Sequence, residues 1–438
     1  MNDNFRKVLI IAYYFPPMGL SGVQRTAKFA KYLKRYGWLP TVLTVEPGAY
    51  FAFDDSLLKE IEEAGVRVVR TQSLDMSRLL KKRHVIRMPS EFTRKLLQFF
   101  NDTFFIPDTK ILWKYKAVRT AIKLHKQEKF DLIFATSPPQ TDFLIGAKLK
   151  KKLGIPLVID YRDAWLDYPF KYFPTPLHRF IHKHLERKVL KAADRVIVTH
   201  RRVKEGILKR YGLFDYNEID IIPQGYDPED ILHVSKKKTH SSKMKITHAG
   251  TFYASRTPKY FLEALSNVLK ADHKLRDKIE VIFIGNLRNC DQKLIQKLEL
   301  NNIVKILGYL PHRECVEHLL DSDVLWFVID NDYQTPGKLY EYFGTRKPII
   351  ASVVDGYTRR LLLESKAAIC VDLRDVKGHE EAILEFYSKF EQKKLPRIPI
   401  EFSTKFDRLV LTGELAKVFS SLMFYDNWSF VKIGENDK

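Results

Sequence analysis

Apolar, β-type runs alternate with amphipathic helical stretches along almost the whole chain of 438 residues. Several of these runs are nearly free of polar residues, such as VLIIAYYF at 8–15. Runs of that kind are expected of parallel strands that helices cover on both faces. Strands that alternate with helices form βαβ units, so the sequence predicts an α/β protein with doubly wound sheets.

The alternation occurs twice, and a chain of this length can build two sizeable cores. The basic, polar stretch 224–243 has the composition of a linker. We therefore predict a Rossmann-like first domain over 1–226, a second over 227–400, and a C-terminal helix and tail over 401–438 that packs toward the first. Ligands of such sheets bind beyond the carboxyl ends of the strands, which here would face a central cleft. The expected strands are 7–15, 41–46, 66–71, 131–137, 156–162, 194–200 and 219–223, then 245–250, 279–284, 304–307, 323–329, 347–352 and 368–372.

Basic residues outnumber acidic ones, with 74 Lys and Arg against 53 Asp and Glu and a formal net charge of +21. Nucleic acid, anionic lipid and phosphorylated substrates all fit such an excess. No zinc finger, aromatic RNA-binding strand motif or basic zipper accompanies the charge, so no nucleic-acid partner is expected.

Cysteine usage and hydropathy bear on the compartment. The three cysteines, Cys290, Cys315 and Cys370, are widely separated, which is typical of a reducing compartment. No run of about eighteen or more apolar residues occurs, so no membrane-spanning helix is predicted. We expect a cytoplasmic protein that is soluble or peripheral on the inner face of the plasma membrane.

The segment 78–105 combines basic residues with Leu, Phe and Ile on helices separated by Pro89. One interpretation is an ordinary amphipathic surface helix. The other is an interfacial segment whose apolar face enters anionic lipid while its cations meet the headgroups. The cations that would face such a membrane are Lys81, Lys82, Arg83, Arg87, Arg94 and Lys95.

Two loops in the first half follow expected strands. Gly22 lies in a Pro- and Gly-rich loop before a helix, where backbone N–H groups could approach a phosphate, although a turn glycine explains it equally. Asp163 follows the strand 156–162, and a carboxylate there could face the cleft. The structural alternative for Asp163 is a helix cap or a partner for Arg162.

Two loops in the second half carry cations. Arg256 lies just before an expected helix, where a cation is unfavourable unless an anion lies between the two. In the segment 330–352, Lys338 could bind a diphosphate, and Glu341, on the same helical face, could bind sugar or ribose hydroxyls. The structural alternative for this pair is an exposed ion pair of i,i+3 spacing.

An ordered set of motifs resembles one family over nearly the whole chain. The chain is similar to the retaining glycosyltransferases of the GT-B fold, family 4, especially the branch that builds capsular, exopolysaccharide and O-antigen chains. The motifs are VLIIAYYFPP and SGVQR near the start, FDLIFATSPP (130–139), IPLVIDYRDAW (155–165), AADRVIVTHR (192–201), IIPQGYD (221–227), HAGTF (248–252), VKILGYLP (304–311) and PGKLYEYFGTRKPII (336–350).

The resemblance implies roles for residues of the second half. Glu341 resembles the carboxylate that holds the ribose of the donor nucleotide. Lys338, Arg256 and the backbone amides of Thr335 and Gly337 resemble contacts to the donor diphosphate.

The resemblance extends to further positions. Gly22 resembles the first-domain glycine that closes over the donor phosphates, and Asp163 a polar residue near the acceptor and the reacting carbon. Tyr309 and Leu310 correspond to positions at which the protein backbone of the family contacts the nucleotide base. Together with Lys338 and Arg256, Asp163 is expected to be catalytic.

One position departs from the family pattern. The family often carries a second glutamate before the ribose-binding one, and Tyr333 stands at that place, next to Asp332. Asp332 could substitute if the loop were shifted. Either residue is a candidate contact to the donor sugar, whose identity is left open.

The reaction implied is transfer of a sugar from a UDP- or GDP-sugar, with retention, to a saccharide or lipid-linked acceptor. Cationic groups and helix dipoles can stabilise the departing diphosphate. No Asp-x-Asp motif is evident at the end of an expected strand, so neither a metal nor another cofactor is expected. Two alternatives stay open. One is a nucleotide-sugar 2-epimerase on the same fold, for which His248 would be the candidate base. The other is a catalytically inactive, basic binding or scaffold protein.

Overall fold

The computed structural model describes residues 5–19, 21–48, 50, 53–75, 91–168, 171–232, 242–252, 256–333 and 336–428. The chain divides into two compact units. Unit 1 comprises 1–223 together with 408–438, and unit 2 comprises 224–407.

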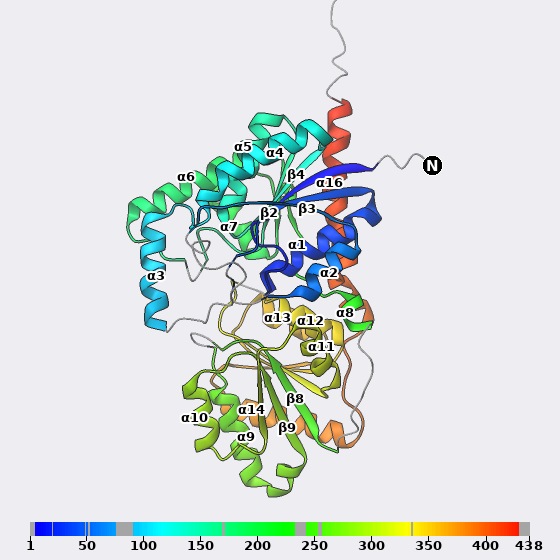
Figure 1. Cartoon of the computed structure of the whole chain (residues 1–438). Helices are drawn as coiled ribbons and strands as arrows, with labels where there is room; N and C mark the ends of the chain where they lie inside the picture. Colours follow the sequence, from blue (N-terminus) through cyan, green and yellow to red (C-terminus); the bar gives the residue numbers. More distant parts are fainter. Residues whose placement is uncertain are drawn as a thin grey trace, which may run out of the picture. The chain divides into compact units, whose positions relative to one another are not determined.

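Unit 1 is built on a seven-stranded sheet with the strand order β3-β2-β1-β4-β5-β6-β7 (Figure 1). All neighbouring strands run parallel, so their carboxyl ends meet at one edge. The strands are β1 (Arg6–Ile11), β2 (Trp38–Val45), β3 (Arg67–Thr71), β4 (Leu132–Ser137), β5 (Leu157–Tyr161), β6 (Arg195–Val198) and β7 (Ile219–Ile221). The helices are α1 (Ser21–Tyr32), α2 (Asp55–Glu63), α3 (Glu91–Phe104), α4 (Lys114–Glu128), α5 (Gln140–Leu153), α6 (Pro176–Ala192), α7 (Arg201–Tyr211) and α16 (Arg408–Trp428).

The β1 strand shows why the runs are apolar throughout. Val8 and Ile10 belong to a core with residues of α1, α2 and α16. Leu9 and Ile11 belong to a second core with residues of α4, α5 and α6. Successive side chains of a strand point to opposite faces, so a strand covered on both sides must be apolar at every position.

The C-terminal helix α16 completes one face of unit 1. The ring of Phe419 lies 5.2 Å from that of Trp38 and 5.4 Å from that of Phe134 in β4, measured between centroids. The Tyr36 hydroxyl donates to the Leu409 carbonyl at 2.8 Å. Helix α16 therefore shares a core with β1.

Unit 2 repeats the design on a six-stranded sheet with the order β10-β9-β8-β11-β12-β13, again parallel throughout. Its strands are β8 (Met244–Ala249), β9 (Ile279–Ile284), β10 (Val304–Gly308), β11 (Val324–Ile329), β12 (Ile349–Val353) and β13 (Ala368–Val371). Its helices are α8 (Pro228–Leu232), α9 (Lys259–Ala271), α10 (Asn289–Lys297), α11 (His312–Asp321), α12 (Gly337–Thr345), α13 (Tyr357–Glu364), α14 (Val376–Glu391) and α15 (Ile400–Ser403).

The two sheets with their covering helices confirm the predicted fold, an α/β protein of two Rossmann-like domains. In unit 2, α9, α10 and α14 share one core with alternate residues of β9, and α11, α12 and α13 share the other. Among the described residues, no helix is long and apolar enough to cross a membrane.

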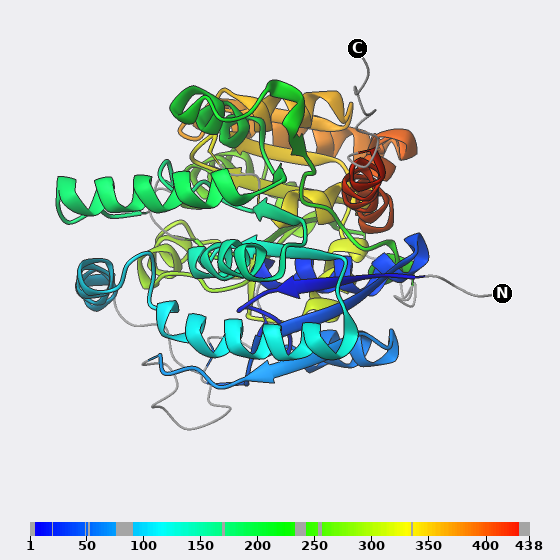
Figure 2. The same ribbon diagram turned by 90° about the horizontal axis from the view of Figure 1, so that it is seen from above.

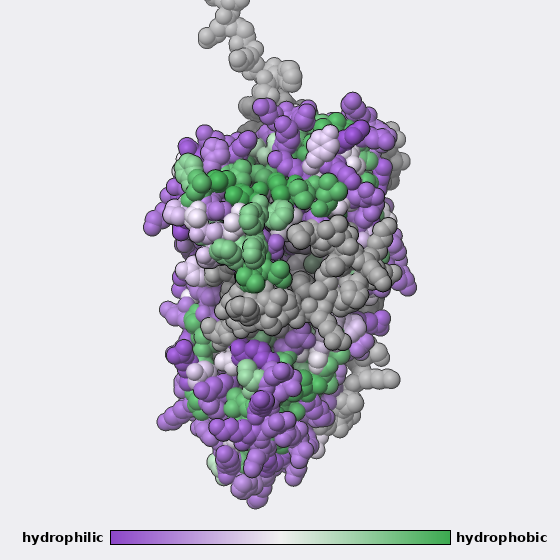
Figure 3. Space-filling view, turned by 60° about the vertical axis from the view of Figure 1, so that its left-hand side comes forward, coloured by the Kyte–Doolittle hydropathy of each residue, from purple (hydrophilic) through white to green (hydrophobic). Residues whose placement is uncertain are grey.

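One face of unit 1 exposes many large apolar side chains. In Figure 2, α3 (teal) and α6 (green) extend outward on the left, and Figure 3 shows a band of hydrophobic surface across this face. We call the exposed apolar residues at the junction of the two helices the apolar ridge. It consists of Leu96, Leu97, Phe99, Phe100, Phe104, Tyr172, Leu177 and Phe180.

Candidate functional site

The carboxyl ends of β8 and β11 place two opposite charges together in unit 2. These strands are neighbours in the sheet, and the loops that follow them carry Arg256 and Asp330. Arg256 Nε lies 3.1 Å from Asp330 Oδ1. Both side chains are about nine-tenths buried, so Asp330 holds the Arg256 guanidinium in place at the loop edge.

Helix α12 begins at Gly337, beyond the carboxyl end of β11, and carries the predicted ion pair. Leu339, Tyr342 and Phe343 of this helix are fully buried in the core of unit 2, which fixes the rotation of the helix. Lys338 Nζ then lies 2.8 Å from Glu341 Oε2, and the side chains are 28% and 9% exposed. Residues three apart face the same side of a helix, so the spacing makes this contact local.

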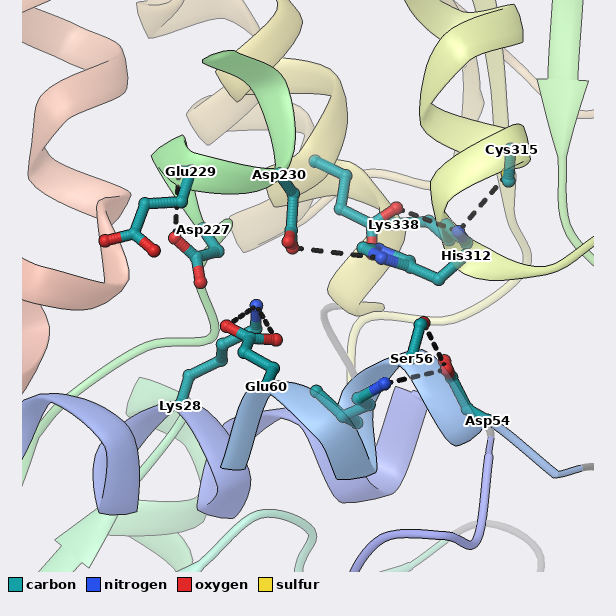
Figure 4. Close-up of polar contacts among 12 residues, drawn as sticks. Lys28, Asp54, Ser56, Glu60, Asp227, Glu229, Asp230, His312, Cys315 and Lys338 are labelled. Carbon is teal, nitrogen blue, oxygen red and sulfur yellow. Dashed lines mark hydrogen bonds and ion pairs between the residues drawn. The ribbon is translucent and has the colours of Figure 1, made fainter. Parts of the chain in front are cut away.

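A histidine that the sequence did not single out completes this group. His312, the first residue of α11, places Nε2 3.3 Å from Glu341 Oε1. Its Nδ1 lies 3.8 Å from Asp230 Oδ2 of α8, and Figure 4 shows the imidazole pointing toward that carboxylate. On the other side, Lys338 Nζ lies 3.6 Å from Cys315 Sγ. Each Glu341 carboxylate oxygen therefore has a cationic or imidazole partner.

The charges of this group reinforce one another. Burial alone would raise the pKa of Glu341, but Lys338 and His312 together hold it well below its usual range. Burial would lower the pKa of Lys338, and Glu341 raises it instead. The pKa of His312 is raised as well, because the attraction of Glu341 exceeds the effect of burial. At neutral pH the Glu341 carboxylate and the Lys338 ammonium are both charged.

Asp332 and Tyr333, the two candidate sugar contacts, differ in environment. Asp332 is buried, and its Oδ1 accepts the backbone N–H of Tyr357 at 2.7 Å, which places its charge at the N-terminus of α13. Gly356 allows this approach, since a Cβ built there would lie 2.2 Å from the Asp332 carboxyl carbon. Tyr333 is 46% exposed.

Asp330 and Asp332 directly follow β11, with the Asp-x-Asp spacing that can hold a divalent cation through carboxylate oxygens. The expectation that no such motif ends a strand was therefore wrong. In the structure the two carboxylates have separate partners. Asp330 pairs with Arg256, and Asp332 binds the N-terminus of α13.

Tyr309 and Leu310 follow the edge strand β10 in unit 2. Tyr309 is 52% exposed and Leu310 is partly buried. Thr335 lies outside the described residues, as do Lys81, Lys82, Arg83 and Arg87. Arg94 and Lys95 belong to α3, and their side chains also lie outside the described part.

In unit 1, Arg162 connects the end of β5 to Gly22 in α1. Its guanidinium donates to the backbone carbonyls of Gly22 and Pro138. Gly22 has ordinary helical geometry, and a Cβ built on it meets only the end of the Arg162 side chain, at 3.5 Å. The fold therefore does not require glycine at this position. Asp163 follows on the same loop and is partly buried.

Asp160, at the penultimate position of β5, belongs to a buried ion pair. Arg25 of α1 donates to both of its carboxylate oxygens, at 3.1 Å from Nε and 2.8 Å from Nη2. Thr136 of β4 donates to the same carboxylate at 2.9 Å. The two charged side chains are no more than 1% exposed. This bidentate pair fixes α1, and so Gly22, against the carboxyl edge of the sheet.

Comparison with known families accounts for both halves of the chain. Residues 21–230 match the sequence profile described as Glycosyltransferase Family 4, and residues 232–401 match that described as Glycosyl transferases group 1. The chain belongs to the glycosyltransferases. No curated protein sequence gives a significant match.

Solved structures share the GT-B fold of this glycosyltransferase at low sequence identity. A glycosyltransferase from Rickettsia africae superposes with a TM-score of 0.66 at 14% identity, over 96% of this chain and 99% of that one. HepE from Anabaena, in complex with UDP and glucose, gives 0.62 at 16% identity, over 95% and 100%. A putative UDP-N-acetylglucosamine 2-epimerase from Listeria monocytogenes gives 0.59 at 13% identity, over 96% and 97%.

Two residues of the candidate site in this glycosyltransferase, His312 and Asp330, were not predicted from the sequence. Asp330 follows directly on the apolar run 324–329. If the strands before Arg256 and Asp330 had been expected to be neighbours in the sheet, the contact between these two residues could have been predicted. No comparable signal marks His312, because its contact with Glu341 joins residues that are 29 positions apart and depends on how α11 packs beside α12.

Proposed function

We propose that this glycosyltransferase moves a sugar from a UDP- or GDP-sugar to a saccharide or lipid-linked acceptor, with retention of anomeric configuration, in the synthesis of cell-surface polysaccharide. One observation carries the proposal. At the N-terminus of α12, beyond the carboxyl edge of the unit 2 sheet, Lys338 and Glu341 form a largely buried ion pair that is charged at neutral pH.

The diphosphate of the donor would bind at the first turn of α12. Helix N-termini attract phosphate because their first backbone N–H groups lack intrahelical acceptors and the helix dipole is positive there. Lys338 lies on this turn, and Arg256 adds a second cation that the loop holds in place through Asp330. In this proposal the backbone amides of Gly337 and Thr335 contact phosphate oxygens. Charge that develops on the departing diphosphate would then meet groups already in position.

Glu341 would bind the ribose of the nucleotide. A carboxylate is a strong acceptor for two hydroxyl groups, and its strength depends on its staying ionised. Lys338 and His312 keep it ionised. When phosphate draws Lys338 away, His312 would keep holding Oε1, so the carboxylate would stay oriented. Backbone at Tyr309 and Leu310 would meet the base.

Further assignments concern the reacting sugar. Asp332 or Tyr333 would contact its hydroxyls, and Asp163 of unit 1 would act near the acceptor and the reacting carbon. Gly22 would allow the α1 loop to approach the phosphates. Transfer with retention passes through an oxocarbenium-like centre, and we propose that Arg256, Lys338 and the α12 dipole stabilise the leaving group without a metal.

One similar protein supports the choice of donor. HepE from Anabaena has been solved with UDP and glucose and also with UDP-glucose. At this low identity the likeness concerns the fold, and the donor class is carried to this chain as part of the proposal.

A thermal scan of the purified protein against UDP, GDP and common nucleotide sugars tests the donor class. We expect one nucleotide and its sugars to raise the melting temperature, as any ligand that binds only the folded state does. Release of that nucleotide should then depend on an added lipid-linked saccharide. NMR of the product should show the anomeric configuration of the donor. Stabilisation by neither nucleotide, or release of a 2-epimer with no acceptor present, would overturn the proposal.

A further inference from the structure

Aromatic members of the apolar ridge contact one another, and the two helices that carry the ridge are joined. Phe99 contacts Tyr172, with ring centroids 6.0 Å apart, and Phe100 stacks on Phe104 at 6.4 Å. The N-terminal end of α6 is joined to the C-terminal end of α3, because His178 Nε2 lies 3.1 Å from the Thr103 carbonyl. A second link is the ion pair of Lys171 with Asp102 at 3.0 Å.

The ridge residues stand well out from the surface. Leu97, Phe100 and Phe104 share one face of α3, because they are three and four positions apart, and they are 51%, 49% and 71% exposed. On α6, Leu177 and Phe180 are 62% and 67% exposed. Isolated exposed apolar residues are ordinary, but a contiguous set of this size marks an interaction surface.

The ridge continues into a basic stripe on α6. Leu177, Phe180, His184, Arg187 and Lys191 are three and four positions apart, so they lie along one face of α6, and all five are exposed. His184, Arg187 and Lys191 form the basic stripe. Beside the stripe, Arg179, Lys183 and Lys188 are exposed too. The one acidic residue of α6, Glu186, is buried, so the exposed surface of this helix carries positive charge only.

Positive charge also gathers from neighbouring helices. The pKa of Lys114 in α4 is lowered by burial and further by the nearby Lys188 of α6 and Lys148 of α5. Cations that repel one another in the free protein are stabilised by an anionic surface.

We propose that the apolar ridge and the basic stripe of α6 dock unit 1 on an anionic phospholipid bilayer. Phe, Tyr and Leu side chains would enter the boundary between headgroups and acyl chains, while the Lys and Arg side chains meet lipid phosphates. A bilayer fits this surface better than a protein partner does. It offers negative charge along the whole length of α6, and it accepts protruding side chains without a matching pocket. The proposal does not depend on the donor assignment.

Flotation with vesicles tests the docking. The full-length protein should float with vesicles of phosphatidylcholine and phosphatidylglycerol and stay behind with phosphatidylcholine alone. Binding should weaken at about 1 M salt, where the Debye length falls to about 3 Å. Failure to bind the anionic vesicles would overturn the proposal and would leave a protein partner as the occupant.

Two double variants separate the apolar and basic contributions. Arg187→Gln with Lys191→Gln should weaken partitioning about 25-fold, since each cation near an anionic surface contributes about fivefold. Phe100→Ser with Phe104→Ser should weaken it about 100-fold, at roughly tenfold for each buried Phe. Unchanged binding in both would also overturn the proposal.

Matched controls lie on unit 2. Lys293→Gln with Lys297→Gln removes two exposed cations of the same spacing from α10, and Leu363→Ser with Leu384→Ser removes two exposed apolar residues. Both controls should float like the parent protein. Every variant should keep the cooperative thermal unfolding of the parent protein, which shows that the variant is folded whether or not a nucleotide binds. Stabilisation by the donor nucleotide, where the parent protein shows it, should persist, which separates this proposal from the proposed function. The Arg187/Lys191 variant decides the result if the Phe variant does not fold.

Discussion

Lys338 Nζ lies 2.8 Å from Glu341 Oε2, one turn along α12, with side chains that are 28% and 9% exposed. The spacing alone fits an ordinary surface ion pair. Lys417 and Glu414 of α16 have such a pair with three-residue spacing, and their side chains are 81% and 53% exposed at 3.9 Å. The two pairs differ in burial. An exposed ion pair contributes little to stability, whereas a partly buried pair at a helix N-terminus places a cation where an anionic ligand can bind.

Replacing either member of the α12 pair should abolish most turnover and leave the fold intact. Lys338→Ala removes a cation from the departing diphosphate, and comparable losses cost about 10²–10³-fold in kcat. Glu341→Ala removes charged hydrogen bonds, at about 10–100-fold in kcat/KM. Steady-state kinetics with the donor found by thermal scanning measures both. Glu414→Ala with Lys417→Ala is the control and should behave like the parent protein.

Gly22→Ala should keep stability and lose activity. The position lies in the first turn of α1 and has space for a Cβ, so Ala is expected to change the free energy of unfolding by less than about 1 kcal/mol. In the proposed function the added methyl group would obstruct the approach of α1 to phosphate, and kcat/KM should fall about tenfold or more. Urea unfolding and kinetics on the same preparation check this. An active Gly22→Ala protein would remove Gly22 from the site.

His312 should make stability depend on pH above about 6.5. The pKa of His312 is raised, because Glu341 outweighs burial and the opposing charge of Lys338, with a smaller contribution from Asp230. The stabilising attraction is complete below the ordinary His pKa of about 6.5 and is lost as pH rises through the raised value. The difference in free energy of unfolding between the parent and His312→Gln should therefore shrink toward alkaline pH. A constant difference between about pH 6 and 9 would contradict the assignment.

His248 should act in the opposite direction. Burial lowers its pKa to about 4, and its ring lies against Phe252, with centroids 4.6 Å apart. The unfolded chain takes up a proton below about pH 6.5 and the folded chain does not, so stability should fall between about 6.5 and 4. His248→Gln should reduce this acid sensitivity in urea unfolding. The pKa of His182 in unit 1 is also lowered to about 4, so the part of the acid sensitivity that comes from His182 should remain in the His248→Gln protein.

The pair of Arg25 with Asp160 should be essential for stability. Asp160→Asn leaves a fully buried guanidinium without its counter-charge, a loss of about 3–5 kcal/mol. Glu205→Gln at the exposed pair with Arg201, whose side chains are 63% and 51% exposed, should cost less than about 1 kcal/mol. Urea unfolding of the three proteins gives the comparison. Equal effects of the two substitutions would contradict the structural role of the buried pair.

Strand positions were predictable because apolar runs determine them. The run 279–284 coincides with β9 (Ile279–Ile284), and 194–200 differs from β6 (Arg195–Val198) only at its ends. The predicted run is longer because Asp194, Thr199 and His200 flank the strand, where their side chains hydrogen-bond to the backbone of other segments. Helix α8 (Pro228–Leu232) was missed within the stretch 224–243, because a five-residue helix with a polar sequence carries too little periodicity to stand out from a linker.

The candidate site was predictable only in part. Lys338 and Glu341 are joined by local helical spacing, so their contact could be expected. The contacts of His312 with Glu341 and of Arg256 with Asp330 join separate elements, and they follow from strand order and helix packing. Burial of the α12 pair was also not readable, since it depends on the neighbouring α11.

Titration of the donor nucleotide into the parent protein, Lys338→Ala and Glu341→Ala measures whether the donor binds at α12. Isothermal calorimetry with UDP and GDP gives the dissociation constant of each. We expect one nucleotide to bind the parent protein. Each substitution should weaken that binding by about 10–100-fold, which corresponds to the loss of charged hydrogen bonds of about 1.5–3 kcal/mol. Unchanged affinity in both folded variants would contradict the placement of the donor site at α12.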